Sequence, residues 1–238
     1  MKRGMGMAGI VVAGFALLAP LAAGAAGGTI VKMSGPVTVE RGGQSLPASA
    51  GMELADGDTL DSAKGGSAQL RFDDDSVFVV PGGSALKVEE FRRPRAGLDG
   101  RAIFSLLRGG FRTITGLVGR SRRDVYQVRT GVATIGIRGT AYSAVLCGGG
   151  NCGAKGKFKD GLYVKVDQGV VAVTNAKGEV SLRAGQTAFV ESAATAPVRV
   201  QLSPFSDPQF DAEFNVDVEF QMDVPPPRIE PDPPASPS

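Results

Sequence analysis

Residues 125–145 read as a β-strand region interrupted by glycine. At a period of two, one face carries Ala133, Ile135 and Ile137, and β-branched residues dominate the run. Gly136 and Gly139 fall inside this pattern. A glycine within a strand marks a bulge, a bend or a close approach of another backbone. The run therefore predicts a buried strand pair, carrying one long cation, Arg138, at the centre of an all-β domain.

Composition agrees with this and narrows the chemistry. Low aromatic content with abundant Gly, Val, Ser and Thr favours many short strands joined by tight turns. The 238 residues suffice for one large β domain or two small ones. The chain contains no His, which excludes a Ser-His-Asp triad, a Cys-His dyad and a His-ligated metal. A carboxylate pair could still perform acid–base chemistry. We predict no enzyme and no cofactor.

The N-terminus has the pattern of a secretory signal peptide. Residues 1–25 begin with Lys2 and Arg3, continue with an apolar run over 10–21 and end in the small residues 23–25. The apolar run is shorter than the roughly 20 residues of a membrane span. We expect cleavage at the end of this segment, no transmembrane span afterwards, and a periplasmic, secreted or cell-surface protein. An uncleaved anchor is the alternative.

The two cysteines fit an oxidising compartment. Cys147 and Cys152 bracket a glycine-rich loop between a strand ending near Leu146 and another beginning near Leu162. A disulfide is the interpretation we favour, and two free buried thiols are the alternative. Zinc would need further nitrogen or sulfur ligands that this chain lacks.

The domain organisation follows from pattern and charge. We predict a β domain over residues 26–202, an acidic extension with a possible strand over 203–224, and a Pro-rich disordered tail over 225–238. Residues 26–202 hold 23 Lys and Arg against 16 Asp and Glu, whereas residues 203–238 hold one Arg against eight acids. Hairpins are expected around 73–76 and around the Gly109-Gly110 pair.

An internal repeat links the two ends of this domain. From a starting glycine, apolar residues follow two, four and eleven positions later, and a second glycine follows sixteen later. The first copy is Gly35, Val37, Val39, Leu46 and Gly51, and the second is Gly169, Val171, Val173, Val180 and Gly185. A hairpin unit used twice predicts stacked β-hairpins in a solenoid-like or sandwich-like domain.

Residues 133–140 (ATIGIRGT) resemble the core motif of the FecR domain family. The resemblance extends to 35–39, 54–60, 166–171 and 182–186, and covers most of residues 30–190. It implies an exported all-β domain without catalytic activity. The best-known members are anti-sigma regulators that span the inner membrane and relay the state of an outer-membrane iron–siderophore receptor to a cytoplasmic sigma factor.

That signalling activity is not expected to carry over. Only residues 1–8 precede the apolar segment, whereas a sigma-factor regulator needs a cytoplasmic region there. The resemblance implies instead a periplasmic or surface-associated module that binds another envelope component.

Arginines supply the candidate binding residues. Nine of them, against the single acid Asp99, lie at 92, 93, 95, 101, 108, 112, 120, 122 and 123. Guanidinium groups bind phosphate with bidentate geometry, so lipopolysaccharide phosphate or an acidic glycan is a candidate partner. The candidate binding residues are Arg108, Arg112, Arg120, Arg122 and Arg123 from this cluster, and Arg138 and Thr140 from the motif.

Each arginine assignment has an alternative. The cluster is also explained by a solvated basic face or by a docking site for the chain's own acidic tail, and Arg138 by an ion pair that braces a bend. Nucleic acid is not expected, because the chain is exported and no aromatic stacking pattern accompanies the arginines.

The acidic turns have two interpretations. Asp56-Gly57-Asp58 and the aspartates 73–75 could supply oxygen ligands to Ca²⁺, but Asp-rich turns also arise from backbone conformation alone. We predict no metal site.

The sequence thus predicts a binding module for an envelope protein or an anionic glycan. A carboxylate-dependent enzyme acting on glycan or peptidoglycan and a structural or assembly protein of the envelope are the alternatives. The oligomeric state is left open.

Overall fold

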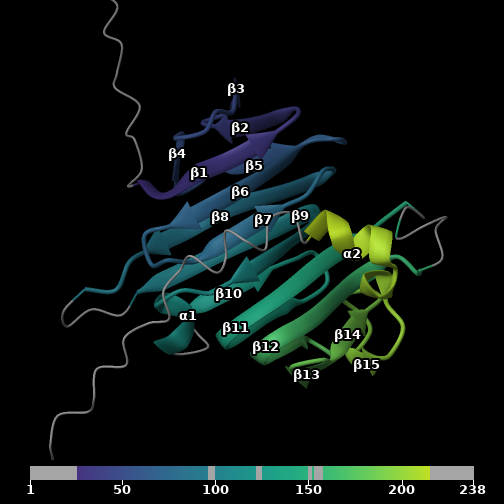
Figure 1. Ribbon diagram of the computed structural model, residues 1–238. Helices are drawn as coiled ribbons and strands as arrows, with labels where there is room; N and C mark the ends of the chain where they lie inside the picture. Colours follow the sequence, from purple (N-terminus) through teal and green to yellow (C-terminus); the bar gives the residue numbers. More distant parts are fainter. Residues whose placement is uncertain (1–25, 96–99, 122–124, 150–151, 153–157, 215–238) are drawn as a thin grey trace, which may run out of the picture.

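The computed structural model describes residues 26–95, 100–121, 125–149, 152 and 158–214 (Figure 1). The expected signal peptide, Arg122, Arg123 and the expected Pro-rich tail lie outside the described residues. No helix within those ranges is long and apolar enough to cross a membrane.

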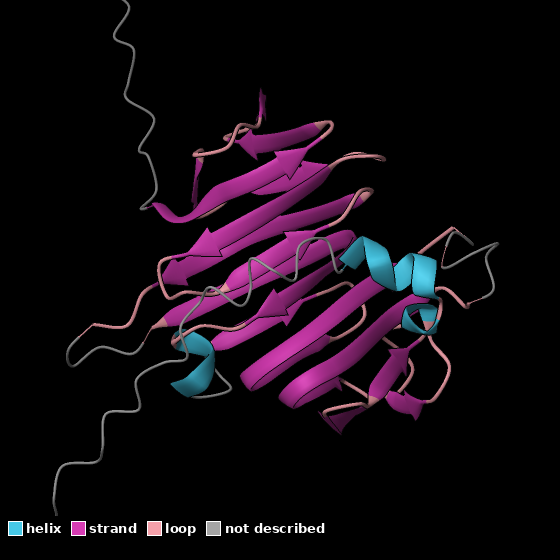
Figure 2. Cartoon of the chain, viewed as in Figure 1, coloured by secondary structure: helices cyan, strands magenta, loops and turns pink. Residues whose placement is uncertain are grey.

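Strands dominate the described chain (Figure 2). They are β1 (Ala26–Ser34), β2 (Val37–Arg41), β3 (Gln44–Pro47), β4 (Glu53–Ala55), β5 (Thr59–Ser62), β6 (Ser67–Phe72), β7 (Val77–Val80), β8 (Ser84–Arg92), β9 (Arg101–Ile114), β10 (Tyr126–Arg129), β11 (Thr134–Cys147), β12 (Gly161–Asn175), β13 (Gly178–Arg183), β14 (Thr187–Val190) and β15 (Val198–Val200). The helical elements are α1 (Val118–Ser121), the 3₁₀ helix η2 (Pro204–Ser206) and α2 (Pro208–Phe214).

The described strands form one hydrogen-bonded sheet that folds into two layers. The first layer has the order β3-β2-β5-β8-β9-β10-β11-β12-β13, and the second has the order β4-β1-β6-β7-β9-β11-β12-β14-β15. The long strands β9, β11 and β12 belong to both layers. Their N-terminal and C-terminal halves pair with different neighbours. The predicted all-β, sandwich-like class is therefore confirmed.

Aromatic rings fill the space between the layers. The ring of Phe72 in β6 lies 4.9 Å from that of Phe91 in β8 and 5.0 Å from that of Phe104 in β9. Phe78 in β7 lies 4.7 Å from Phe104. Since β6 and β7 do not pair with β8 or with this half of β9, these contacts join the two layers. They belong to one core of buried apolar residues.

Glycines let the long strands pass from one layer to the other. Gly109 in β9, Gly139 in β11 and Gly169 in β12 have φ of 66°, 57° and 82°, a region that favours glycine. The β11–β12 register shifts between Arg138 and Ala141. The expected hairpin around Gly109 and Gly110 is therefore wrong. The chain bends there and continues as one strand, because its second half pairs with β11 rather than with its own first half.

The predicted repeat forms the two ends of the sandwich, seen at the top and bottom of Figure 1. In the first copy Gly35 separates β1 from β2, and in the second Gly169 bends β12. Each copy then makes a hairpin and a glycine corner. The amide of Gly51 donates to the carbonyl of Ile30 at 2.8 Å, and that of Gly185 donates to Val166 at 2.8 Å. The same backbone corner thus closes both ends.

Candidate interaction surfaces

Two of the predicted arginines, both in β9, form ion pairs with carboxylates of strands that lie two positions away in the sheet. The guanidinium of Arg108 lies 2.6 Å from Asp61 in β5, and that of Arg112 lies 2.9 Å from Asp167 in β12. Arg112 is also largely buried. The described arginines of the sequence cluster therefore lie on β8, on the segment after it, on β9 and on α1.

Three other arginines form an exposed group that we call the arginine face: Arg120, Arg138 and Arg183. Arg138 pairs in register with Val170, which pairs with Arg183. Both arginines therefore point from the same side of the first layer, with Cα atoms roughly 10 Å apart. Arg120 in α1 lies near the bulge of β11 that follows Arg138, since its Cγ is 3.8 Å from where a Cβ on Gly139 would lie.

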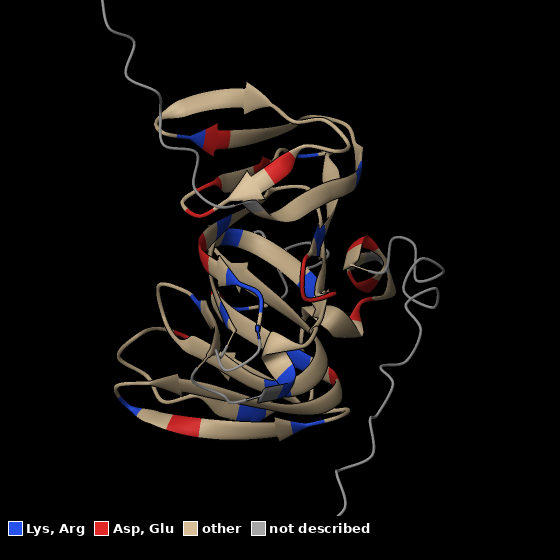
Figure 3. Ribbon diagram, turned by 90° about the vertical axis from the view of Figure 1, so that its left-hand side faces the viewer, with Lys and Arg blue, Asp and Glu red and all other residues tan. Residues whose placement is uncertain are grey.

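No residue in the described part of the chain forms an ion pair with these three guanidinium groups. The alternative in which Arg138 pairs with a neighbouring carboxylate therefore has no support within that part. Figure 3, which shows the left-hand side of Figure 1, has Lys and Arg segments in its middle and lower part. Arg183 was missed by the sequence analysis, because only the strand register places it beside Arg138.

Thr140 is buried beneath this face. Its amide donates to Oγ1 of Thr115 at 2.9 Å, and that hydroxyl donates to the Thr140 carbonyl at 3.0 Å. The reciprocal pair ties the bulge of β11 to the end of β9. Thr140 therefore positions the arginine face and does not reach its surface.

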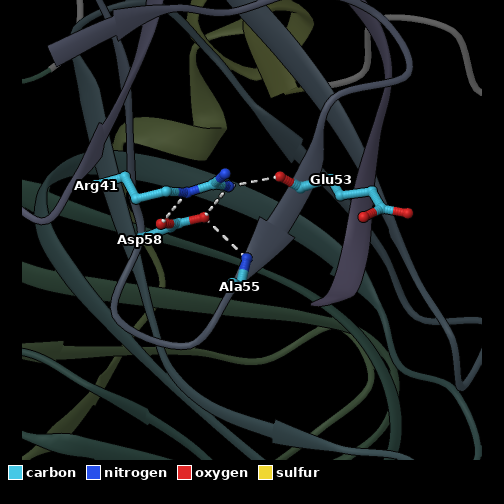
Figure 4. A network of polar contacts seen from close by, with 4 residues as sticks. All are labelled: Arg41, Glu53, Ala55 and Asp58. Carbon is cyan, nitrogen blue, oxygen red and sulfur yellow. Dashed lines mark hydrogen bonds and ion pairs between the residues drawn. The ribbon is translucent and has the colours of Figure 1, made fainter. Parts of the chain in front are cut away.

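The first acidic turn is a structural network (Figure 4). Asp58 is 1% exposed and accepts two hydrogen bonds from the Arg41 guanidinium, at 2.9 and 2.6 Å, and one from the Ala55 amide at 2.8 Å. The hydrogen bond with Asp58 raises the pKa of Arg41. Arg41 also donates to the carbonyl of Glu53 at 2.7 Å. All of these groups are engaged within the fold.

The second acidic turn anchors helix α1. Asp74 is fully buried, and its two oxygens accept hydrogen bonds from the amides of Ser76 and Val118, both at 3.0 Å. Asp73 and Asp75 are exposed. Among the described residues, no group of three or more His, Cys, Asp or Glu is arranged to hold a metal ion. The acidic turns are explained by their backbone contacts.

The predicted disulfide between Cys147 and Cys152 is confirmed. It follows β11 and belongs to a second, smaller apolar cluster. The other members are Val145, Tyr163, Phe205 and Phe214, with Phe158, Phe189 and Phe210 packed against them. The described part of the predicted acidic extension is helical, as η2 and α2, and supplies three of these phenylalanines. The possible strand beyond residue 214 lies outside the described residues.

A groove of about 1260 Å³ runs beside α2. One wall consists of the glycine turns at Gly65, Gly66, Gly82, Gly83, Gly109 and Gly110, and the other includes Phe210, Glu213 and Phe214. A Cβ on Gly65 or Gly83 would have no neighbour within 4 Å, so these two turns border open space. The sequence analysis did not predict the groove, because its walls come from turns far apart in the chain.

These features define a class of protein: an all-β module of glycine-cornered hairpins, in which the buried Asp58 and Asp74 are engaged in structure and three exposed arginines have no carboxylate partner among the described residues. Residues 58–199 match the family model described as FecR protein, and the chain belongs to the FecR family. No match to a curated protein was found.

Solved structures similar to this chain include two crystal structures of a proposed anti-sigma factor from Parabacteroides distasonis ATCC 8503. Their sequence identities are 15% and 14%, and their TM-scores are 0.45 and 0.43. Each alignment covers 62% of this chain and 61% of the other, so this chain spans less than two thirds of that protein.

Proposed function

We propose that this FecR-family chain is an exported, non-catalytic binding module of the bacterial envelope, related to periplasmic signalling regulators. Its arginine face engages an anionic component of the envelope, either an acidic protein surface or an anionic glycan such as lipopolysaccharide. The observation that carries the proposal is the group of Arg120, Arg138 and Arg183. These three exposed cations lack a carboxylate partner among the described residues.

The physical reason is the contrast between free and paired arginines. Arg108 and Arg112 are neutralised by strand carboxylates, whereas the arginine face keeps its donors available. Guanidinium groups bind phosphate and carboxylate with two parallel hydrogen bonds. The three side chains come from α1, β11 and β13, so the sandwich sets their spacing before a partner arrives. Such preorganisation reduces the entropy cost of binding.

The compartment and the absence of catalysis rest on separate observations. The disulfide supports an oxidising compartment, and family membership supports an association with the envelope. Two aspartates of the acidic turns, Asp58 and Asp74, hold backbone amides and, for Asp58, an arginine. The carboxylate-dependent enzyme therefore has no supporting observation.

The test is charge reversal of the arginine face. The variant carries Arg120→Glu, Arg138→Glu and Arg183→Glu, and the matched control carries Arg71→Glu, Lys159→Glu and Lys177→Glu, which are exposed elsewhere. We expect the variant to lose at least about tenfold in affinity, the loss of two or three charge-assisted contacts. The control should change by less than about twofold.

Two measurements compare the binding of wild type, variant and control. The first is crosslinked pull-down from intact envelopes, and the second is binding to vesicles with and without lipopolysaccharide at two salt concentrations. Recovery of the same partner by wild type and by the arginine-face variant would contradict the proposal. So would recovery of nothing above background by the wild-type chain.

A further inference from the structure

The outer side of the second layer presents an apolar row across four strands. Gly110 in β9 pairs with Val145 in β11, Val145 pairs with Tyr163 in β12, and Tyr163 pairs with Phe189 in β14. Paired residues point to the same side of a sheet. A polar row lies next to it, formed by Arg112, Ser143, Lys165 and Thr187. We call the two rows together the outer platform.

Residues 204–214 cover this platform. A Cβ on Gly110 would lie 2.7 Å from the ring of Phe214, so the glycine leaves the space that the ring occupies. The Phe214 ring meets that of Phe205 edge to face and that of Phe210 at a tilt, with ring centroids 5.4 and 5.2 Å apart. The ammonium of Lys165 lies 3.2 Å from the Asp211 carboxylate and 5.9 Å from the Phe205 ring centroid. The contact is thus both aromatic and electrostatic.

The platform and the cover differ in whether the FecR family match includes them. All platform residues lie within the FecR family match, residues 58–199, and the cover lies beyond its end. The cover joins β15 through residues 201–203, where Leu202 is 76% exposed. The cover therefore packs on the surface of the domain as a bound segment that a short linker joins to it.

The fit beneath the cover is incomplete. Within the described part of the chain, the Arg112 Nε and the Ser143 Oγ are buried without a hydrogen-bond partner. Buried polar groups without partners oppose the closed arrangement. Helix α2 has seven residues, too few to be stable without tertiary contacts. The groove beside α2 is lined by Phe210 and Glu213, which are half-buried and exposed, so that solvent reaches one side of the helix. The cover is therefore suited to exchange.

We propose that the outer platform is a docking surface for a short helical segment of a partner protein, and that residues 204–214 are its resident competitor. The chemistry of the resident specifies the partner. It carries two phenylalanines four residues apart, as at Phe210 and Phe214, and an acidic residue that reaches Lys165, as at Asp211. Displacement of the resident exposes the platform.

The test uses the whole chain with a protease site inserted between Gln201 and Leu202. After cleavage, a fluorescent peptide of residues 203–214 is added. Fluorescence anisotropy should show saturable entry into the nicked chain, and entry into the uncleaved chain at least tenfold weaker. Lys165→Glu should weaken entry at least tenfold, and a peptide with Asp211→Lys should recover binding to that variant. Lys177→Glu, on the β12–β13 turn, is the matched control and should change affinity less than twofold.

Four results would overturn the proposal. In the first, the peptide does not bind although the nicked chain keeps its circular dichroism spectrum and its disulfide. In the second, the nicked chain unfolds, which would make residues 204–214 part of the folding core. In the third, neither Lys165→Glu nor the peptide change Asp211→Lys alters the affinity of the peptide for the nicked chain. Finally, size exclusion of the cleaved or uncleaved chain shows a dimer without added peptide, which would assign the platform to a second copy.

Discussion

At the scale of single residues, Gly169 and Gly185 distinguish two roles of glycine: adopting a left-handed backbone conformation and allowing a close approach of another backbone. Their φ values are 82° and 80°, so alanine meets the same backbone strain at both positions. A Cβ on Gly169 would lie 2.2 Å from the carbonyl oxygen of Gly139, whereas a Cβ on Gly185 has no neighbour within 4 Å. The pair therefore isolates the cost of the close approach between β11 and β12.

We expect Gly185→Ala to lower the free energy of unfolding by about 1 to 2 kcal/mol, the cost of the left-handed conformation. Gly169→Ala should lower it by more than about 3 kcal/mol, because the Cβ also displaces a backbone carbonyl of the central strand pair. Urea unfolding followed by circular dichroism measures both. Equal losses would show that the bulge relaxes and that the close approach is not required.

Tyr126 and Tyr142 make stability depend on alkaline pH. Burial is the largest cause that raises the pKa of both phenols above the ordinary tyrosine value. The unfolded chain releases these protons near pH 10, while the folded chain holds them. Stability is therefore complete below about pH 10 and falls as the pH rises further, by about 1.4 kcal/mol per pH unit for each tyrosine.

The expected outcome is that Tyr126→Phe with Tyr142→Phe flattens the decline above pH 10. At pH 7 the double variant should stay within about 1 kcal/mol of wild type, because among the described residues neither hydroxyl oxygen makes a hydrogen bond of good geometry. Unfolding free energies at several pH values between 7 and 11 provide the measurement. A decline as steep as that of wild type would assign it to other groups.

Among the elements, helix α1 shows how a distant side chain holds a short helix in place. Asp74 of the β6–β7 turn accepts the amide of Val118, and its carbonyl accepts the amide of Leu117. Four residues do not form a helix without such support. The same helix carries Arg120 of the arginine face.

Asp74→Ala should therefore destabilise the fold by about 3 kcal/mol, since it leaves two buried amides without an acceptor. Asp73→Ala, one residue away and exposed, should stay within about 0.5 kcal/mol. Thermal unfolding compares the two variants. If Asp74→Ala folds and still binds the envelope partner with unchanged affinity, then α1 does not position Arg120.

The same elements show what could be predicted from the sequence. The turn at 73–76 was predicted because its signal is local, and β6 and β7 flank it as expected. The Gly109-Gly110 pair allows either a reversal or a bend. The pairing of β9 with β8 and then with β11, residues distant in the chain, decides between them. Helix α1 was missed, because its stability comes from Asp74 and not from its own four residues.

The candidate site was predicted only in part, for a similar reason. Long strands carry neighbouring arginines to different partners, so the cluster in the sequence does not become a cluster in space. Arg108 ends beside Asp61 and Arg112 beside Asp167. Arg183 joins Arg138 through the register of three strands, which no local pattern encodes.

For the molecule as a whole, the three bent strands matter more than the repeated ends. β9, β11 and β12 pair with neighbours in both layers, so neither layer can separate while their bends persist. The repeat units at the two ends contribute shorter strands. β3 and β15 have no buried residue. Local opening is thus expected to begin at the ends and to stop at the central strands.

Native-state hydrogen exchange tests this arrangement. Amides in β11 and β12 on both sides of Gly139 and Gly169 should exchange with one common free energy close to that of global unfolding, because each strand continues through its bend from one layer into the other. Amides in β3 and β15 should exchange fastest, since those strands pair on one side and bury little. If one half of β11 instead exchanged at a lower free energy than the other, the glycine bends would act as hinges between two separate layers. The spacing of the arginine face on the first layer would then be independent of the outer platform on the second.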